Sequence, residues 1–165
     1  MQSLSPIRVA IFGGTGFIGR TLGAAIRQRG GAVLVLSRGA PDDGEHSRTC
    51  DAAQPIDPSL LEGVDVVVNL VGIKAPQRAR GRRQQFEDAH VTATRHIVGA
   101  CEAAGVSRLL HVSVARDADE ELTAAASPYL KTKARGEEVI RGSELEWTIL
   151  RPGICLLYTS PSPRD

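Results

Sequence analysis

A loop with three regularly spaced glycines is the first feature of this 165-residue chain whose residue types could do chemistry. Gly13, Gly16 and Gly19 follow the apolar run 7–12 and open the helical pattern Phe17–Arg29. In such a loop one glycine permits a tight turn, one lets the backbone approach a pyrophosphate, and one lets helix and strand pack closely. Free N–H groups at the helix start would bind the phosphates. The context favours a dinucleotide site over three ordinary turn glycines, and no Lys-Ser or Lys-Thr pair follows, which disfavours a mononucleotide loop.

Tyr129 and Lys133 form a second candidate group, four residues apart in a stretch with helical character. Residues at positions i and i+4 share one face of a helix, so the phenol and the ammonium can point into one site. A tyrosine phenol has a pKa of about 10, and a neighbouring ammonium lowers that pKa. The pair could therefore move a proton at neutral pH; the alternative is an ordinary pair on a helix surface.

The end of the second apolar run bears on which nicotinamide cofactor the loop would take. At this point of a dinucleotide fold an acidic residue binds the ribose 2′-hydroxyl of NAD, whereas an arginine accommodates the 2′-phosphate of NADP. The chain has Ser37 and Arg38 here, and no carboxylate follows before Asp42. Arg38 offers a planar, charged donor group and Ser37 a supporting hydroxyl. We expect NADP(H) to be favoured over NAD(H); the alternative is that Arg38 is a solvated loop residue.

Strands and helices must alternate along the chain to position these groups. Apolar runs predict strands, and helical periodicity ended by glycine predicts helices. Several strands are apolar on both faces, so the pattern predicts an α/β fold with a doubly wound parallel sheet, the Rossmann architecture. Ser127 suits the N-cap of the last helix and Pro128 its first turn. The expected strands are 7–12, 32–37, 64–71, 108–114 and 146–151, with a short edge strand ending near residue 51, and the expected helices are 17–29, 59–62, 83–104 and 128–141.

The composition excludes several classes of protein. Apolar residues make up 42% and charged residues 24% of the chain, and the net charge is +1, which excludes a disordered tail and a strongly basic nucleic-acid module. Aromatic residues make up only 4%, so we expect no stacking platform for nucleic acid. No apolar run approaches the ~18 residues of a transmembrane helix. We therefore expect a small-molecule substrate and no nucleic-acid partner.

Neither the cysteines nor the histidines have the spacing of metal ligands. Cys50, Cys101 and Cys155 are three in number and cannot all pair, which fits a reducing cytoplasm. His90 and His111 are expected to pack in the core or lie at the surface. We therefore expect a cytoplasmic protein without a metal site.

The glycine loop and later motifs resemble a known family. Gly13-Gly14-Thr15-Gly16-Phe17-Ile18-Gly19 resembles the nucleotide-binding motif of extended and atypical short-chain dehydrogenases/reductases, which include the NAD-dependent epimerase/dehydratase family. Tyr129-Leu130-Lys131-Thr132-Lys133 matches that family's Tyr-x-x-x-Lys, and Leu150-Arg151-Pro152-Gly153 matches the Arg-Pro after its sixth strand. The resemblance covers residues 7 to 154. It implies cofactor contacts from Gly13, Thr15, Gly16, Phe17, Ile18 and Gly19.

The resemblance also implies roles for residues at the ends of other strands. Ser113 matches the family's substrate-polarising Ser/Thr, and Lys133 matches its lysine that holds the nicotinamide ribose. The segment 69–72 looks like the family's cofactor-side segment after the fourth strand. The segment 50–52 resembles the strand end whose aspartate binds the adenine, although a plain turn aspartate is an alternative. The further cofactor-binding residues implied in these two segments are Asp51, Ala52, Asn69, Val71 and Gly72.

Within this family, the runs Val68–Ile73 and His111–Ser113 are most similar to bacterial relatives of the accessory NAD(P)H-binding subunit of respiratory complex I. The family implies hydride transfer between NADP(H) and a carbonyl or hydroxyl carbon. Tyr129 would exchange the proton, and Ser113 would polarise the oxygen. The alternative is an accessory or regulatory protein that holds NADPH without turnover, like the complex I subunit or nitrogen-regulator relatives. A complex I-like chain would associate with a membrane complex, at the inner face of the membrane.

The end of the chain departs from the family. The family continues beyond the Arg-Pro segment into another strand and a substrate-binding region, whereas this chain has Cys155–Asp165 after Ile154. These last residues resemble the translation of a transposon-end sequencing adapter. We therefore expect residues 1–154 to be an incomplete NAD(P)-binding Rossmann domain, truncated before the C-terminal substrate region, and residues 155–165 not to be native.

Overall fold

Six parallel strands form one sheet in the computed structural model, which describes residues 6–40, 46–74, 81–115 and 127–153. Their spatial order is β3-β2-β1-β4-β5-β6, and every neighbouring pair is parallel. The chain order reverses between β1 and β4, where a doubly wound fold has its switch point. The expected Rossmann architecture is confirmed. The strands are β1 (Arg8–Phe12), β2 (Ala32–Ser37), β3 (Ser47–Thr49), β4 (Val66–Asn69), β5 (Arg108–Val112) and β6 (Glu146–Leu150).

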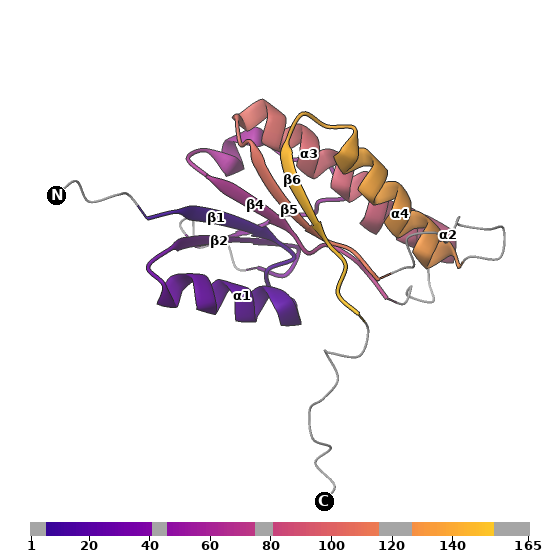
Figure 1. Cartoon of the computed structure of the whole chain (residues 1–165), viewed down its shortest axis with the longest axis horizontal. Coiled ribbons are helices and arrows are strands. Elements are labelled where there is room, and N and C mark those ends of the chain that lie inside the picture. Colours follow the sequence, from indigo (N-terminus) through magenta and orange to yellow (C-terminus); the bar gives the residue numbers. More distant parts are fainter. Residues whose placement is uncertain (1–5, 41–45, 75–80, 116–126, 154–165) are drawn as a thin grey trace, which may run out of the picture.

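Helices cover both faces of the sheet (Figure 1). Helix α1 (Phe17–Gln28) lies on one face, and α3 (Ala93–Ala104) and α4 (Pro128–Arg141) lie on the other. Three shorter helical segments are η1 (Pro58–Leu61), α2 (Arg82–Glu87) and η2 (Asp88–Thr92). Within the described ranges, no helix combines the length and the apolar character needed to cross a membrane.

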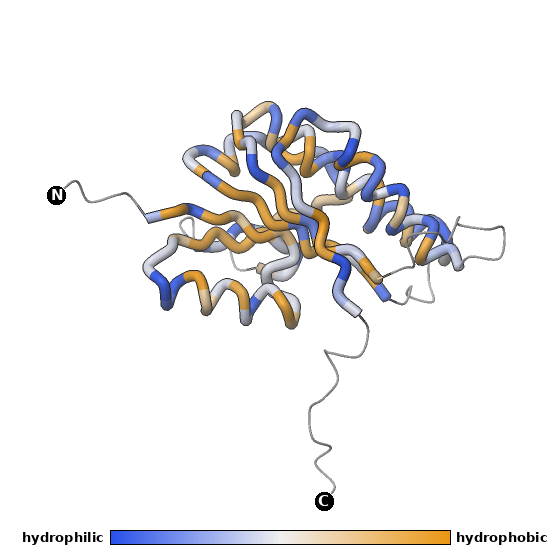
Figure 2. The backbone as a smooth tube through the Cα atoms, in the orientation of Figure 1, coloured by the Kyte–Doolittle hydropathy of each residue, from blue (hydrophilic) through white to orange (hydrophobic). Residues whose placement is uncertain are grey.

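The central strands are mostly apolar because both faces of the sheet are buried (Figure 2). Successive residues of a strand point to opposite faces. Ile11 therefore packs with Val68 on the α1 side, whereas Phe12 packs with Val67 on the side of α3 and α4. Full burial of each such side chain stabilises the fold by about 1.5–3 kcal/mol.

The helix expected over residues 83–104 is present without a gap, but it is not α-helical throughout. It consists of α2, a π-helical turn that is η2, and α3. Helix α4 packs closely on this turn, because a Cβ on Gly136 would lie 2.4 Å from the carbonyl oxygen of His90. The hydroxyl of Thr94 donates a hydrogen bond to the same oxygen at 2.8 Å. Helical periodicity continues on both sides of a π turn, so the apolar pattern alone predicted a single helix.

Two strands end earlier than the apolar runs predicted. The strand expected over 64–71 is β4, Val66–Asn69, because the Asn69 side chain accepts a hydrogen bond from the N–H of Val71 at 2.9 Å and turns the chain out of the ladder. The strand expected over 108–114 ends at Val112, although the N–H of Ser113 still donates to the carbonyl of Leu150 at 2.7 Å. The residues after both strands are thereby free to face a site at the sheet edge.

We predict opposite effects for alanine at two helical glycines. Gly136→Ala should lower the free energy of unfolding by about 1–3 kcal/mol, because its methyl group meets the His90 backbone. Gly99→Ala in α3 is the matched control. No described atom lies within 4 Å of its added Cβ, so this change should raise the free energy of unfolding by about 0.5–1 kcal/mol. Urea denaturation measures both values, and equal effects would contradict the close packing of α4 on η2.

Candidate cofactor and active site

Each glycine of the loop after β1 has a distinct geometry. Gly13 has a φ of 77°, and its N–H donates to the carbonyl of Leu36 at 2.8 Å. A Cβ on Gly19 would lie 2.5 Å from the Cα of Gly14, so only glycine lets α1 pack on the loop. Gly16 is the N-cap of α1, and no described side chain caps that helix end. The first N–H groups of α1 can therefore bind an anion.

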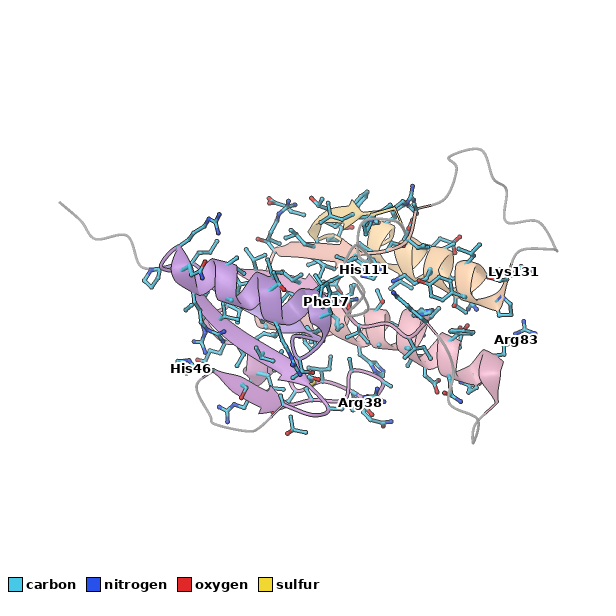
Figure 3. The ribbon with its side chains drawn as sticks, turned by 90° about the horizontal axis from the view of Figure 1, so that it is seen from below. Phe17, Arg38, His46, Arg83, His111 and Lys131 are labelled. Atoms are coloured by element: carbon cyan, nitrogen blue, oxygen red, sulfur yellow. The ribbon has the colours of Figure 1, made fainter. Side chains whose placement is uncertain are left out.

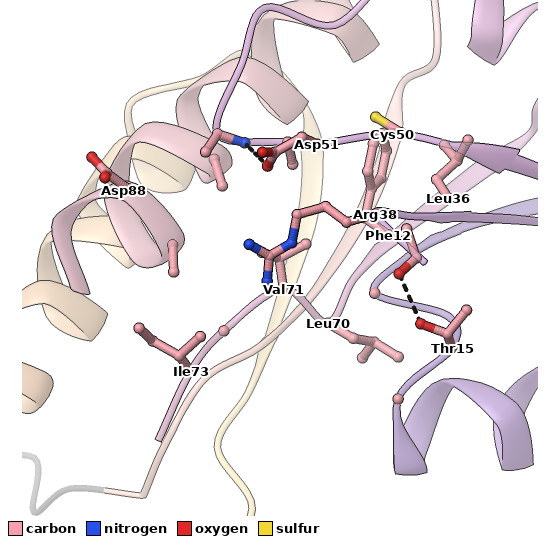
Figure 4. Close-up of a pocket in the computed structure, with 18 of the residues that line it drawn as sticks. Phe12, Thr15, Leu36, Arg38, Cys50, Asp51, Leu70, Val71, Ile73 and Asp88 are labelled. Atoms are coloured by element: carbon pink, nitrogen blue, oxygen red, sulfur yellow. Dashed lines mark hydrogen bonds between the residues drawn. The ribbon is translucent and has the colours of Figure 1, made fainter. Parts of the chain in front are cut away.

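A cavity of about 620 Å³ lies at the carboxyl ends of the strands, beside this loop (Figure 4). It sits where β1 and β4 adjoin, which is the switch point at which doubly wound sheets bind ligands. Most of the cofactor-binding residues predicted from the sequence line it: Gly13, Thr15, Gly16, Ser37, Arg38, Asp51, Ala52, Val71 and Gly72.

The remaining predicted cofactor residues lie outside the cavity lining. Gly19 is in the first turn of α1 together with Phe17 and Ile18. The Phe17 side chain is 73% exposed (Figure 3), so this residue can contribute to a phosphate site through its backbone alone. Lys133 is buried in α4 and borders the cavity only at Gly72, where an added Cβ would lie 3.9 Å from its Nζ.

The wall formed by the ends of β2 and β3 carries the polar groups expected for an adenosine. The hydroxyls of Thr15 and Ser37 are 2.7 Å apart, which joins the glycine loop to the end of β2. Arg38 extends into the cavity between Asp51 and Val71 (Figure 4). The carboxylate of Asp51 accepts a hydrogen bond from the N–H of Ala53 at 3.1 Å. The exposed guanidinium of Arg38 at this wall is better suited to bind the 2′-phosphate of NADP than the 2′-hydroxyl of NAD.

Asn69 supports the cavity from behind and does not line it. Its side chain is fully buried, its Nδ2 donates to the hydroxyl of Thr94 at 3.3 Å, and its Oδ1 accepts from the N–H of Val71. The amide therefore holds the segment after β4 against α3. At this segment Val71 and Gly72 line the cavity, whereas Asn69 does not.

The carboxyl end of β5 carries Ser113 and is contacted by Lys133 from α4. Nζ of Lys133 donates to the carbonyl of Val112 at 3.0 Å, next to Ser113 in the chain. The hydroxyl of Ser113 is buried and has no hydrogen-bond partner among the described residues, so it can bind a substrate oxygen. Burial lowers the pKa of Lys133 to about 8, although the Glu137 carboxylate acts in the opposite direction. At neutral pH the amine is thus still charged.

Tyr129 lies one helical turn before Lys133, in an aromatic cluster. Its ring meets the ring of His90 edge-on at 5.4 Å between centroids and that of Phe86 at 5.8 Å. Burial raises the pKa of Tyr129, and the cation that lowers it is Lys74. The expected lowering of this pKa by the Lys133 ammonium is not found, because burial outweighs the cation and the cation that acts on the phenol is Lys74.

His90 is the residue of this site that the sequence did not reveal. It is 1% exposed, its Nδ1 lies 2.8 Å from the hydroxyl of Thr132, and its Nε2 lies 3.2 Å from both backbone N and O of Ile73. It thus ties the segment after β4 to α4 and supports the ring of Tyr129. Its partners are 17 and 42 residues away, so no local spacing could indicate this role.

His111 is equally buried and lies in the interior (Figure 3). Burial and the Lys133 ammonium lower the pKa of His90 to about 4 and that of His111 to about 3, so both rings are neutral near pH 7. Across the described ranges, no three His, Cys, Asp or Glu side chains gather in a way that could hold a metal ion.

Comparison with known proteins gives a consistent result. A family model described as NAD(P)H-binding matches residues 13–161, which includes part of the segment after Ile154. That segment lies outside the described residues, and its interpretation as a translated sequencing adapter stays a prediction. NADH dehydrogenase [ubiquinone] 1 alpha subcomplex subunit 9 of Arabidopsis thaliana is 32% identical over 94% of this chain and 40% of its own length. An epimerase family protein of Mycobacterium tuberculosis is 36% identical over 64% of this chain and 36% of its own length. The chain thus spans well under half of these relatives.

Solved structures share the architecture. MoeE5 in complex with UDP-glucuronic acid and NAD superposes with a TM-score of 0.72 and 26% identity, over 87% of this chain and 54% of that one. TunA, an NAD-dependent NDP-hexosamine 5,6-dehydratase, gives a TM-score of 0.71 and 25% identity, over 88% of this chain and 54% of that one. The fold is therefore that of short-chain dehydrogenase/reductase-like epimerases and dehydratases.

We predict that stability falls in acid because His90 is buried as the neutral ring. An unfolded histidine has a pKa of about 6.5, so the unfolded state binds more protons as the pH falls from 6.5 toward 4. Between pH 7 and pH 5 this histidine binds a proton in the unfolded state but hardly in the folded state. The free energy of unfolding should therefore fall by about 2 kcal/mol over this range. His90→Gln should remove that part of the pH dependence, as measured by urea denaturation at both pH values. An unchanged pH dependence in the variant would show that His90 is not held neutral.

Proposed function

We propose that this chain, which belongs to the NAD(P)H-binding family, is an oxidoreductase that transfers hydride between NADP(H) and the carbonyl or carbinol carbon of a small molecule. The observation that carries the proposal is the arrangement at the end of β5, where the Lys133 amine donates to the carbonyl of Val112 and the hydroxyl of the adjacent Ser113 has no hydrogen-bond partner among the described residues. Nζ of Lys133 lies 3.9 Å from the position that a Cβ on Gly72, a residue of the cavity lining, would take. Tyr129 stands one turn away on α4.

The residues of the cavity fit the proposed cofactor. Gly16 presents bare backbone to the cavity, where a Cβ would lie 3.2 Å from the carbonyl of Gly13, and the open end of α1 offers N–H groups for a pyrophosphate. Arg38 would bind the 2′-phosphate, with Ser37 as a supporting hydroxyl. Asp51 would bind the adenine, and Lys133 the nicotinamide ribose. Bound NADP(H) would supply or accept hydride at its nicotinamide ring.

Tyr129 and Ser113 have different roles at the substrate oxygen. The hydroxyl of Ser113 donates a hydrogen bond to that oxygen and polarises the carbonyl. The phenol of Tyr129 gives it a proton in the reducing direction and takes one in the oxidising direction. Burial raises the pKa of this phenol, so the reducing direction starts from the protonated form. Solvent returns the proton to Tyr129 after each turnover.

A second candidate function is non-catalytic binding of NADPH in an accessory or regulatory protein. Relatives named as complex I subunits match 92–94% of the chain, and the Lys133 amine donates to the carbonyl of Val112. Such a chain would associate with a membrane complex at the inner face of the membrane. In either case we propose that the chain acts in the cytoplasm, where Cys50 and Cys101, which are free thiols here, stay reduced.

Tyr129→Phe should separate these two functions. We expect NADPH to bind with unchanged affinity, because the ring still packs on His90, whereas turnover should fall at least about 100-fold with the loss of the phenol proton. Fluorescence titration measures NADPH binding, and absorbance of NADPH follows turnover with simple carbonyl compounds and nucleotide sugars. Equal turnover in both proteins would reject Tyr129 as the proton donor. NADPH binding without turnover of any compound, measured on the protein expressed from its complete gene, would favour the accessory function.

Arg38→Asp should shift the cofactor preference from NADPH toward NADH. The arginine provides charged donors for a 2′-phosphate, whereas aspartate accepts from a 2′-hydroxyl and repels phosphate. We expect the ratio of the two dissociation constants to change at least about tenfold. Arg29→Asp, at the far end of α1, makes the same change of charge away from the cavity and should leave the ratio unchanged. Equal ratios for Arg38→Asp and the unmodified chain would refute the role of Arg38.

A further inference from the structure

A fully buried carboxylate lies one turn beyond Lys133 on α4. Glu137 is 0% exposed, and its Oε1 accepts a hydrogen bond from Nε of Arg151 at 3.0 Å. Its Oε2 accepts a second bond from Nη2 of Arg151 and a third from Arg141 at 2.9 Å. The two arginine side chains are 31% and 39% exposed. Two partly solvated cations therefore compensate one carboxylate in the interior.

Burial of this carboxylate is energetically costly, and apolar packing could join α4 to β6 without that cost. Removing a carboxylate from water costs several kcal/mol, and well-packed apolar residues of similar volume are often at least as stable as a buried ion pair. Glu137 nevertheless lies at position i+4 from Lys133, on the same buried face of the helix. Its position thus points to an effect on the lysine amine.

We propose that Glu137 is a positioning residue that keeps the buried Lys133 amine charged and directed at the carbonyl of Val112, and that the compensating Arg151 guanidinium weakens this effect of the carboxylate. This inference rests on the proposed function, because it is the Lys133 amine that would bind the nicotinamide ribose. It assigns to Glu137 the upper pH limit of cofactor binding. In this assignment Arg141 keeps the carboxylate ionised when Arg151 is absent.

The other groups that face Lys133 cannot hold its charge. His90 from η2 and His111 from β5 both interact electrostatically with Lys133, and both are neutral near pH 7 because their pKa values are lowered to about 4 and about 3. Burial lowers the pKa of Lys133 to about 8, and the one group that acts against it is Glu137. Among the described residues, Glu137 is therefore the anion that keeps this amine protonated.

The pair Glu137–Arg151 also fixes the strand ends on which the site is built. Arg151 directly follows β6, so its bonds to Glu137 join the end of that strand to α4. The carbonyl of Leu150, one residue earlier, accepts a hydrogen bond from the N–H of Ser113 on the β5 side. The amine of Lys133 in α4 donates to the carbonyl of Val112, the last residue of β5. These contacts form a closed ring through β6, β5 and α4. Ser113 and Lys133 are thus positioned by one set of interactions.

The test is the titration of Lys133 in the full chain without cofactor. The ε-carbon resonance of Lys133, assigned with Lys133→Met, reports the ionisation of the amine directly. Glu137→Gln should lower the titration midpoint by about one pH unit, because it removes the neighbouring anion. Arg151→Gln should raise the midpoint, because the carboxylate loses a compensating cation. Glu138→Gln, an exposed neighbour on the same helix, is the matched control and should leave the midpoint unchanged.

Shifts of opposite sign in the two variants would support the proposal, since general damage to packing would move the midpoint in one direction. Unchanged midpoints, or shifts of the same sign, would overturn it. If Glu137→Gln fails to fold, Arg151→Gln and Arg141→Gln still test the sign. A parallel measurement of NADPH affinity against pH tests the proposed function separately. Midpoints that move as expected, with an affinity that does not follow them, would leave the charge network standing and reject the cofactor role of Lys133.

Discussion

Parallel pairing of all six strands is the constraint on which the rest of this molecule depends. Because every strand runs the same way, the carboxyl ends of β1, β2, β4 and β5 lie at one edge of the sheet. The glycine loop, Arg38, Gly72 and Ser113 follow those four ends. An antiparallel pair anywhere among them would send one of these groups to the opposite edge. The cavity is thus a direct result of strand direction, and the helices serve to keep that edge open at the switch point.

Helix α4 connects this edge to the interior. Its first turn carries Tyr129, its second carries Lys133, and its third carries the buried Glu137. The close approach of Gly136 to η2 sets the depth at which the helix lies, and the bonds of His90 set its relation to the segment after β4. The contacts of α4 therefore position Tyr129 and Lys133, the segment after β4 and part of the core together. A substitution that alters one of these contacts should also displace the other groups.

The sequence was sufficient to predict the parts of the structure that depend on local pattern. Apolar runs predicted the doubly wound parallel sheet, and capping residues predicted where helices begin and end. Ser127, for example, is the N-cap of α4, and its hydroxyl accepts from the N–H of Leu130 at 3.3 Å. Most residues proposed for the cofactor lie in the glycine loop or follow strand ends, and these residues line the cavity. The π turn at His90, the supporting role of Asn69 and the raised pKa of Tyr129 did not follow from local pattern. Each depends on partners brought together by tertiary packing, which spacing along the chain does not encode.

The π-helical turn of η2 has a consequence for how this protein can change in evolution. Such a turn holds one residue more than the α-helical turn it replaces. Deleting a single residue between 88 and 92 would therefore convert the π turn into an α turn and leave α2 and α3 in nearly the same relative orientation. Phe86 would then keep the face that meets α4. A one-residue insertion or deletion, which shifts the faces of a regular helix, should thus be absorbed by the turn itself at this point.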